Sequence, residues 1–256
     1  MQQRWKLIIE YSGPHYAGWQ RQDPPIITVQ GQIEAALKGF CQRDITLMAA
    51  GRTDSGVHGR GQVAHFDLDY GDRPLSGYEL AKALNAHLRG EHIAILSAEP
   101  VTDDFHARFS AVNKMYLYRI LCRPAPAVLE RGLVWWHRKM LDADAMHDAA
   151  QELVGHHDFT TFRDTACQAK SPERSLDRFD VTARPHDERG GIEIRITAEA
   201  RSFLHHQMRN MVGTLALVGE GKWSAKDVRT ALQARDRTKG GPTAPPEGLY
   251  LMRVDY

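Results

Sequence analysis

The chain has 256 residues, of which 42% are hydrophobic and 25% charged, and its 33 basic side chains nearly balance 32 acidic ones. These values are typical of a folded protein and exclude a disordered chain, a collagen-like repeat and a disulfide-stapled mini-protein. No apolar run approaches the roughly 20 residues that a membrane-spanning helix needs. No signal-peptide pattern opens the chain, so we expect a cytoplasmic protein that does not enter a membrane.

Cysteine and charge distribution narrow the function classes. Cys41, Cys122 and Cys167 are isolated, which predicts reduced thiols in or near the core and no zinc ribbon or redox pair. Residues 105–140 hold seven basic side chains and one acidic one, and residues 201–240 hold eight and three. Gathered on one face, these segments would present a basic surface to a polyanion. Scattered over the surface, they would be ordinary solvated charges.

The first part of the chain predicts strands that alternate with two helices. Strands are predicted over residues 5–11, 45–50, 62–68 and 93–98. Thr28 is placed to cap a helix that carries Ile33 and Leu37 at helical spacing. Ser76 and Glu79 match a capping box, which predicts a helix ending near His87.

The second part repeats this pattern. Strands are predicted over residues 115–122, 175–183, 192–200 and 249–256, and the second and third of these pair across a turn at 185–191. Asp142 is placed to cap one helix, residues 203–218 form another, and a short one opens at Ser224.

Two similar blocks with consecutive strands favour an α+β fold over a doubly wound parallel sheet. We therefore expect two similar halves, each an antiparallel sheet covered by helices. The predicted halves are residues 1–110 and 111–256.

The segment most informative about chemistry is residues 51–59, with the sequence GRTDSGVHG, between two predicted strands. Its glycines allow a tight bend and the close approach of a ligand. Arg52 and Asp54 are two residues apart, so in an extended loop they point the same way. An arginine beside an aspartate keeps the carboxylate ionised and oriented, as a nucleophile or general base requires. A turn with an internal ion pair is the simpler structural interpretation.

Two further segments carry candidate residues. Tyr116 and Tyr118 share one face of a predicted strand, where they either pack in the core or offer rings for base stacking. Arg209 lies one position beyond the apolar stripe of the helix at 203–218. A mainly buried arginine needs an acidic partner, and an aspartate in a cleft would serve.

The histidine doublets at 156–157 and 205–206 are poor metal sites, because neighbouring side chains diverge on a strand or helix and no H-x-x-x-H pattern is present. We read the first doublet as part of a capping turn and the second as helix histidines, and we expect no metal. The chain also lacks G-x-S-x-G, phosphate-loop and dinucleotide fingerprints.

These segments resemble the bacterial tRNA pseudouridine synthase A family in order and spacing. The resemblance is carried by four stretches, residues 51–66, 105–118, 203–213 and 247–251. Small departures are Ser55 and Gly59, where alanine is more usual in the family.

The resemblance implies an isomerase that converts uridines 38, 39 and 40 of the tRNA anticodon stem-loop to pseudouridine after flipping the base. It implies Asp54 as the catalytic aspartate, Arg52 positioning the flipped nucleotide, Tyr116 stacking on the uracil, and Arg209 pairing with Asp54. We also expect His58 and Phe203 to contact the substrate. The family implies no cofactor, a homodimer, and two α+β halves around a basic cleft.

Two other functions remain open on the residues alone. A non-catalytic RNA-binding or chaperone module would explain the basic segments and the paired tyrosines. A metal-dependent hydrolase would use the histidine doublets. The loop at Asp54 argues against both, because neither needs an oriented carboxylate there.

Overall fold

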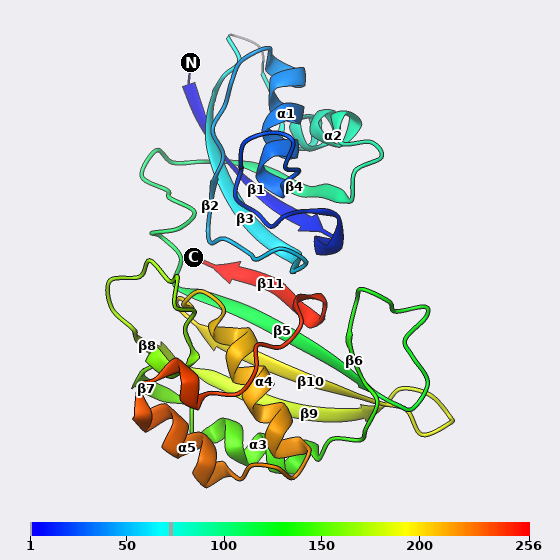
Figure 1. The fold of residues 1–256 in the computed structure, drawn as a ribbon. Coiled ribbons are helices and arrows are strands. Elements are labelled where there is room, and N and C mark those ends of the chain that lie inside the picture. The colour runs from blue at the N-terminus through cyan, green and yellow to red at the C-terminus, as the bar shows by residue number, and fades with distance from the viewer. Residues whose placement is uncertain (1, 72–73) are drawn as a thin grey trace. The chain divides into compact units, whose positions relative to one another are not determined.

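The computed structural model describes residues 2–71 and 74–256 and divides into two compact units (Figure 1). Unit 1 comprises Met1–Val112 with Tyr250–Tyr256, and unit 2 comprises Asn113–Leu249. Each unit is a β-sheet with helices, and most strand pairs are antiparallel. The predicted α+β class is confirmed.

The sheet of unit 1 is built from five strands. They are β1 (Gln2–Tyr11), β2 (Met48–Ala49), β3 (His58–Asp69), β4 (Ile93–Val101) and β11 (Leu249–Asp255). The order is β4-β1-β3-β11, and β2 pairs with β3. In β1, Trp5, Leu7 and Ile9 are buried while the residues between them are partly exposed, as the period of two predicts.

Two helices cover the buried face of this sheet (Figure 1). They are α1 (Val29–Cys41) and α2 (Gly77–His87), and a 3-10 turn spans Gly13–His15. The Thr28 hydroxyl accepts from the Gly31 amide, and Ser76 and Glu79 form the predicted capping box. Both helix starts are therefore confirmed, and their apolar stripes pack in one core with β1 and β3.

The last strand differs from the predicted division of the chain. Residues 250–256 were assigned to the second half, but β11 runs parallel to β3, with Tyr250 opposite His58. The Val112 amide also donates to the Asp255 carbonyl over 2.9 Å. These non-local contacts place the chain end in unit 1, which a boundary drawn at one sequence position does not capture.

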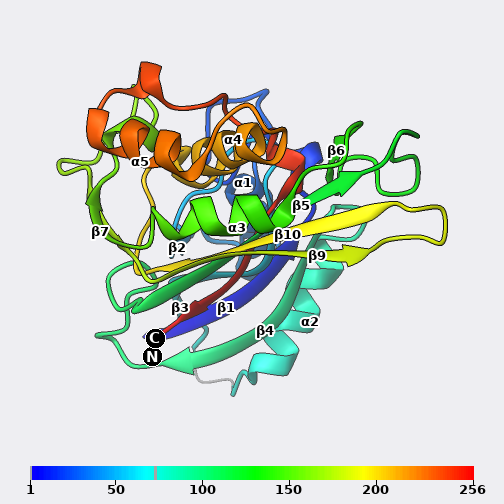
Figure 2. The same cartoon turned by 90° about the horizontal axis from the view of Figure 1, so that it is seen from below.

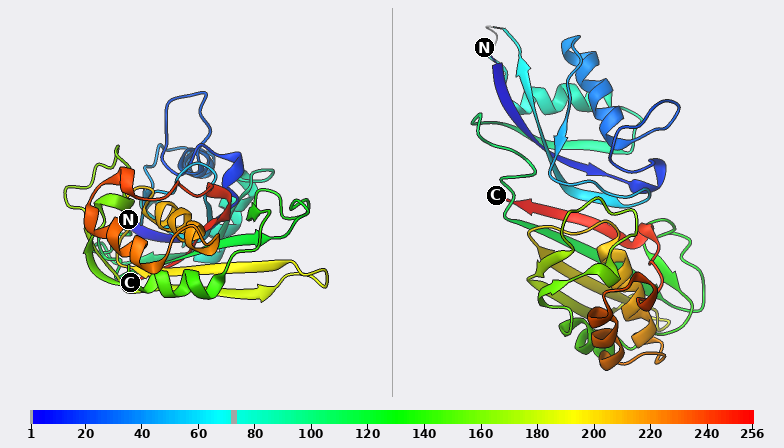
Figure 3. Two further views of the ribbon diagram at one scale, coloured as in Figure 1. Left: turned by 60° about the horizontal axis from the view of Figure 1, so that its bottom comes forward. Right: turned by 60° about the vertical axis from the view of Figure 1, so that its left-hand side comes forward.

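The main sheet of unit 2 has the order β5-β10-β9, with β6 beside β5. Its strands are β5 (Asn113–Cys122), β6 (Trp135–His137), β9 (Arg178–Pro185) and β10 (Ile192–Ala200). The hairpin of β9 and β10 is long and extends away from the helices (Figure 3). A separate pair, β7 (Gly155–Asp158) and β8 (Glu173–Leu176), was not predicted as a pair.

Three helices lie on one face of this sheet (Figure 2): α3 (Ala143–Gln151), α4 (Gln207–Gly219) and α5 (Ala225–Ala234). Short 3-10 turns occupy Thr160–Phe162, Arg237–Lys239 and Pro246–Gly248. The Asp142 cap of α3 is confirmed. The start of α4 at residue 203 was wrong, because His206 adopts φ 60°, a left-handed conformation that a helix cannot continue through.

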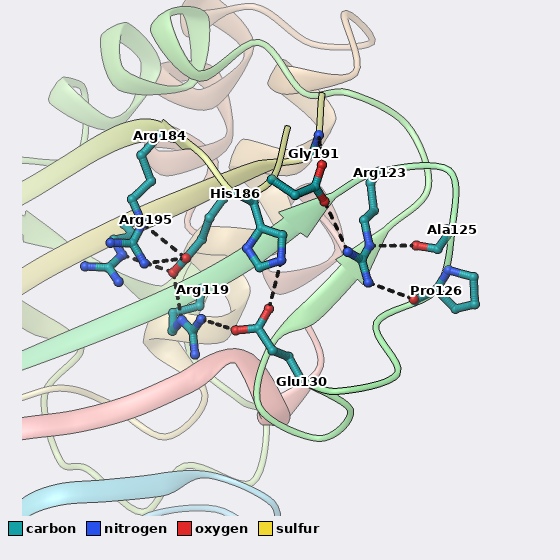
Figure 4. A network of polar contacts seen from close by, with 11 residues as sticks. Arg119, Arg123, Ala125, Pro126, Glu130, Arg184, His186, Gly191 and Arg195 are labelled. Carbon is teal, nitrogen blue, oxygen red and sulfur yellow. Dashed lines mark hydrogen bonds and ion pairs between the residues drawn. The ribbon is translucent and has the colours of Figure 1, made fainter. Parts of the chain in front are cut away.

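A network of arginines and carboxylates links strands of the unit 2 sheet, and Figure 4 labels Arg119, Arg184 and Arg195 in it. Glu193, 2% exposed, accepts hydrogen bonds from Arg119, Arg184 and Arg195 over 2.6–3.0 Å. Burial alone would raise the pKa of this carboxyl, but the three guanidinium groups hold it at about 2. Arg119 also donates to Glu130 over 2.7 Å. The network therefore pins the segment before β6 to the middle of the sheet.

The cysteines and the helix lengths agree with the prediction of reduced thiols and of no membrane-spanning segment. The structure shows Cys41, Cys122 and Cys167 as free thiols, and Cys122 is buried. Among the residues that the structure describes, no helix combines the length and apolar character needed to cross a bilayer.

Candidate active site

Asp54 lies in the connection between β2 and β3, in unit 1. Its neighbour Thr53 is 7% exposed, Asp54 is half-buried, and Arg52 is exposed. The Val57 amide donates to the Asp54 carbonyl over 3.1 Å, which closes a turn around Ser55 and Gly56. Gly56 has φ 80°, a conformation that glycine adopts at little cost. The predicted tight bend is present.

The loop is held by side chains from other segments of unit 1. Gln62 donates from Nε2 to the Gly51 carbonyl over 2.9 Å. The hydroxyl of Ser55 donates to the Tyr16 carbonyl over 3.2 Å, so serine at this position adds a tether that alanine would lack. The Trp19 amide donates to the Thr53 carbonyl over 3.0 Å. The backbone on both sides of Asp54 is thus fixed from outside the loop.

Gly18 and Tyr11 complete this support. Gly18 has φ 94°, and a Cβ added there would lie 2.8 Å from the Thr53 carbonyl oxygen and 3.1 Å from the Ser55 nitrogen. The Tyr11 hydroxyl is 2.8 Å from the Thr53 hydroxyl, and burial raises the pKa of Tyr11 to about 12. The residue at position 18 therefore has to be small for the loop to keep its path.

His58, expected to contact substrate, is 2% exposed at the start of β3. Its ring stacks on Tyr250 with centroids 4.4 Å apart, and its Nδ1 accepts from the Gly13 amide over 3.2 Å. These contacts tie the end of the Asp54 loop to β11 and to the turn after β1. They are structural contacts.

Arg52 does not form the ion pair with Asp54 that the simpler structural interpretation of this loop requires. It is exposed and makes no hydrogen bond or ion pair with any residue in the described ranges 2–71 and 74–256. The side chain is therefore available for an anionic ligand. An exposed arginine with an unpaired guanidinium suits a phosphate oxygen.

Tyr116 and Phe203 lie together in unit 2. Tyr116, on β5, is 8% exposed, and its ring meets that of Phe203 edge-on with centroids 5.0 Å apart. Phe203 is half-buried in the segment before α4. Tyr118 shares the face of Tyr116, as predicted, but is fully buried, with its hydroxyl donating to the Pro245 carbonyl over 2.6 Å. Tyr118 is therefore a core residue.

Arg209 projects from the first turn of α4 and is half-buried. Its Nε donates to the Ala244 carbonyl over 2.8 Å, and the Ala244 amide donates back to the Arg209 carbonyl over 3.0 Å. The segment around Ala244 lies close against the helix, because a Cβ on Gly213 would sit 1.8 Å from the Pro242 carbonyl oxygen. The direction of the Arg209 side chain is thus set by two backbone segments.

The histidine doublets occupy positions other than those expected. His156 and His157 lie on strand β7, not in a capping turn. His205 and His206 precede α4 and do not lie within it, and His206 Nδ1 is 2.6 Å from an Asp164 carboxylate oxygen. The left-handed residue at position 206 moved the helix start past both.

The residues that hold the Asp54 loop were missed. Tyr11, Gly18, Trp19 and Gln62 all contact it, although three of them precede it by more than thirty residues. The one available signal was the pair of glycines at positions 13 and 18, in the segment that follows the strand predicted at 5–11. Such glycines mark a place where another backbone approaches closely.

Comparison with known proteins identifies the family to which this chain belongs. The family model described as tRNA pseudouridine synthase matches residues 7–110 and 149–256, more than half of the chain. The chain belongs to the tRNA pseudouridine synthase family. It is similar to proteins named tRNA pseudouridine synthase A from Paramagnetospirillum magneticum, at 55% identity over 253 residues, and Rhizobium meliloti, at 55% over 255.

These relatives are matched over almost their whole length. The alignments cover 99% of this chain and 95% of the Paramagnetospirillum protein, and 99% of both chains for Rhizobium. A protein of the same name from Parvibaculum lavamentivorans is 52% identical over 253 residues. The prediction of a pseudouridine synthase, and so of an isomerase, is confirmed at the level of the family.

Proposed function

We propose that this chain converts uridine to pseudouridine at positions 38, 39 and 40 in the anticodon stem-loop of tRNA, with Asp54 as the catalytic residue. The observation that carries the proposal is the loop of residues 51–59. It holds a half-buried carboxylate on a backbone fixed from several sides, in a chain of the tRNA pseudouridine synthase family. A fixed carboxylate needs little reorganisation when charge develops at the reacting atom.

The reaction conserves all atoms of the substrate. The bond between N1 of uracil and C1′ of ribose breaks, the base turns, and a new bond forms between C5 and C1′. The C5 proton leaves and N1 gains a proton. Asp54 serves as the nucleophile at C1′ or C6, or as the base that removes the 2′ proton of the ribose.

The target base has to leave its stack before Asp54 can act, which costs a few kcal/mol. We propose that Arg52 offsets part of this cost by binding the backbone of the flipped nucleotide, and that Tyr116 and Phe203 contact the base. Arg209 is the cation assigned to the Asp54 carboxylate. His58 acts indirectly, by supporting the loop through Tyr250 and Gly13.

The cofactor requirement, the oligomeric state and the location of the enzyme are proposed as well. We propose that it works without a cofactor or metal, as a homodimer, in the cytoplasm where its tRNA substrate is found. Chelator treatment is expected to leave the rate unchanged, and sedimentation at micromolar concentration is expected to give twice the mass of 28.9 kDa.

The test is to incubate the purified chain with unmodified tRNA and map pseudouridine by carbodiimide labelling. Labelling confined to positions 38–40 would support the proposal. Tight, salt-sensitive tRNA binding with no labelling would favour the non-catalytic RNA-binding module. Labelling elsewhere would keep the reaction but refute the site.

A further inference from the structure

Phe109 is an exposed aromatic ring in a turn that the catalytic proposal does not use. It follows β4, and 69% of its side chain is exposed, while Ala107 two residues earlier is fully buried. Single exposed apolar residues are common on protein surfaces. Phe109 differs from such residues because hydrogen bonds fix the backbone that carries its ring.

The turn is closed on itself by His106. The ring Nδ1 of His106 accepts from the backbone amides of Arg108 and Phe109, over 3.1 and 3.3 Å. The Ser110 amide donates to the His106 carbonyl, and the His106 amide donates to the Ser110 hydroxyl. The backbone that carries Phe109 thus has few ways to move.

The turn is also anchored to the core of unit 1. The Ala107 amide donates to Nδ1 of the buried His65 over 3.1 Å, and the Tyr256 hydroxyl donates to the Ala107 carbonyl over 2.8 Å. Arg4 donates to the Phe105 carbonyl over 3.0 Å. The exposed ring therefore stands on a rigid base that joins β1, β3 and the chain end.

The Phe109 ring packs against a histidine, and a guanidinium lies over the ring. The His106 ring packs against Phe109 with centroids 4.3 Å apart at 36°. The Arg108 guanidinium carbon lies 5.7 Å from the Phe109 ring centre, and Arg108 forms no ion pair with any described residue. Of the nearby acids, Asp67 is paired with Arg4, while Asp103 and Asp104 are exposed.

We propose that Phe109 and Arg108 form a stacking platform for an unpaired base of the RNA substrate, with the guanidinium binding the adjoining phosphate. A pre-ordered aromatic ring beside an arginine is the combination that binds single-stranded nucleotides. A second copy of the chain is the alternative occupant, and the sedimentation measurement below separates it from RNA. The inference rests on the proposed function, since it takes tRNA as the ligand.

The platform lies well away from the Asp54 loop along the same strand. The loop ends at His58, where β3 begins, and the turn is anchored at His65, seven residues later. At about 3.3 Å per residue this is roughly 20 Å, or several nucleotides. The stacked base would therefore be a different nucleotide from the one that reacts.

The test compares tRNA dissociation constants for Phe109→Ala, Phe109→Leu and Phe109→Tyr. Stacking predicts a rise of roughly 5- to 100-fold for alanine, a similar rise for leucine, and a change under about 3-fold for tyrosine. Arg108→Gln is expected to weaken binding. It should also reduce the slope of log Kd against log salt concentration by the equivalent of about one phosphate contact. Tyr78→Ala is the matched control, because Tyr78 is 75% exposed with Lys82 6.0 Å from its ring, and it is expected to change nothing.

Several results would overturn the platform. They are unchanged affinity in Phe109→Ala, full affinity in Phe109→Leu, and a loss in Phe109→Tyr equal to that in alanine. A change of sedimentation mass in Phe109→Ala would identify the ring as a contact between copies of the chain. The parent enzyme is assayed for pseudouridine in parallel, so that an inactive parent counts against the proposed function, whereas an active parent with these results counts against the platform alone.

Discussion

At the scale of single residues, side chains with similar sequence signals do different work. Tyr116 and Tyr118 alternate on one strand, yet Tyr118 is a core residue bonded to the Pro245 carbonyl and Tyr116 packs edge-on against Phe203. His65 and His58 are both buried on β3, and both use Nδ1 to hold a backbone amide of another segment. Residue type alone did not separate these roles, because they depend on partners far away in sequence.

His65 predicts a pH dependence of stability. Burial disfavours its charged form, and His106 and Arg4 add repulsion, so its pKa is lowered to about 4 from 6.5. Between these values the unfolded chain binds a proton that the folded chain does not. The free energy of unfolding is therefore fully retained above about pH 6.5 and falls by about 1–3 kcal/mol as the pH drops to 4.

This is measured by urea unfolding at pH 7 and pH 4.5. In His65→Gln, the difference in unfolding free energy between the two pH values should shrink by at least about 1 kcal/mol. The control is His156→Gln, at an exposed histidine on β7, which should keep the difference of the parent. An unchanged difference in His65→Gln would show that His65 is not the group responsible.

At the scale of elements, the sequence predicted helices that begin with a side-chain cap. Thr28, Ser76 and Asp142 all cap the helices expected of them. Local signals failed where long-range pairing decides the structure. The three-residue strand β6 exists only because it pairs with β5, and β2 is two residues long where six were predicted.

The Asp54 loop also depends on a contact that is distant in sequence, which local signals do not predict. Its glycines and the Arg-Thr-Asp order were readable in sequence, but its path depends on Gly18, which packs on it from another segment. The absence of an Arg52–Asp54 ion pair could not be predicted, because two residues that are two positions apart in a turn need not point the same way.

Gly18→Ala should therefore disturb the loop. The variant combines a positive φ with a Cβ 2.8 Å from the Thr53 carbonyl oxygen. We expect a loss of about 2 kcal/mol or more in unfolding free energy, and at least a tenfold slower single-turnover rate. Denaturant unfolding measures the loss of stability, and rapid-quench assays of pseudouridine formation on tRNA measure the rate.

Gly90→Ala is the matched control. Its φ of 92° nearly equals that of Gly18, but nothing lies within 4 Å of the added Cβ. It should cost about 1 kcal/mol of stability from the backbone alone and leave the rate unchanged. Equal rates in the two variants would mean that contact between Gly18 and the loop does not matter for activity.

At the scale of the whole molecule, the chain ends inside unit 1 although the preceding 137 residues form unit 2. The last strand carries Tyr250 against His58 and Asp255 against Val112. The pattern of strands and helices predicted the two α+β halves, and the family resemblance agreed with it, but the boundary was placed only by sequence order.

Deleting residues 250–256 should loosen unit 1 selectively. We expect amide exchange to accelerate at least tenfold along β3 and in the 105–112 turn, while β9 and β10 keep their protection. Hydrogen exchange with mass spectrometry resolves the two units. Uniform acceleration of amide exchange in both units would contradict this division of the chain.

The milder Tyr256→Phe variant loses one hydrogen bond to Ala107 and should lower the free energy of unfolding by about 1 kcal/mol, as measured by urea unfolding.

The catalytic role of Asp54 is tested by single-turnover pseudouridine formation by Asp54→Asn on unmodified tRNA, without added metal or cofactor. We expect no detectable product, with a tRNA dissociation constant within a few-fold of the parent. Asp44→Asn, at an exposed aspartate paired with Lys38, should react like the parent. Product formed by Asp54→Asn within a few-fold of the parent rate would show that Asp54 is not the catalytic residue.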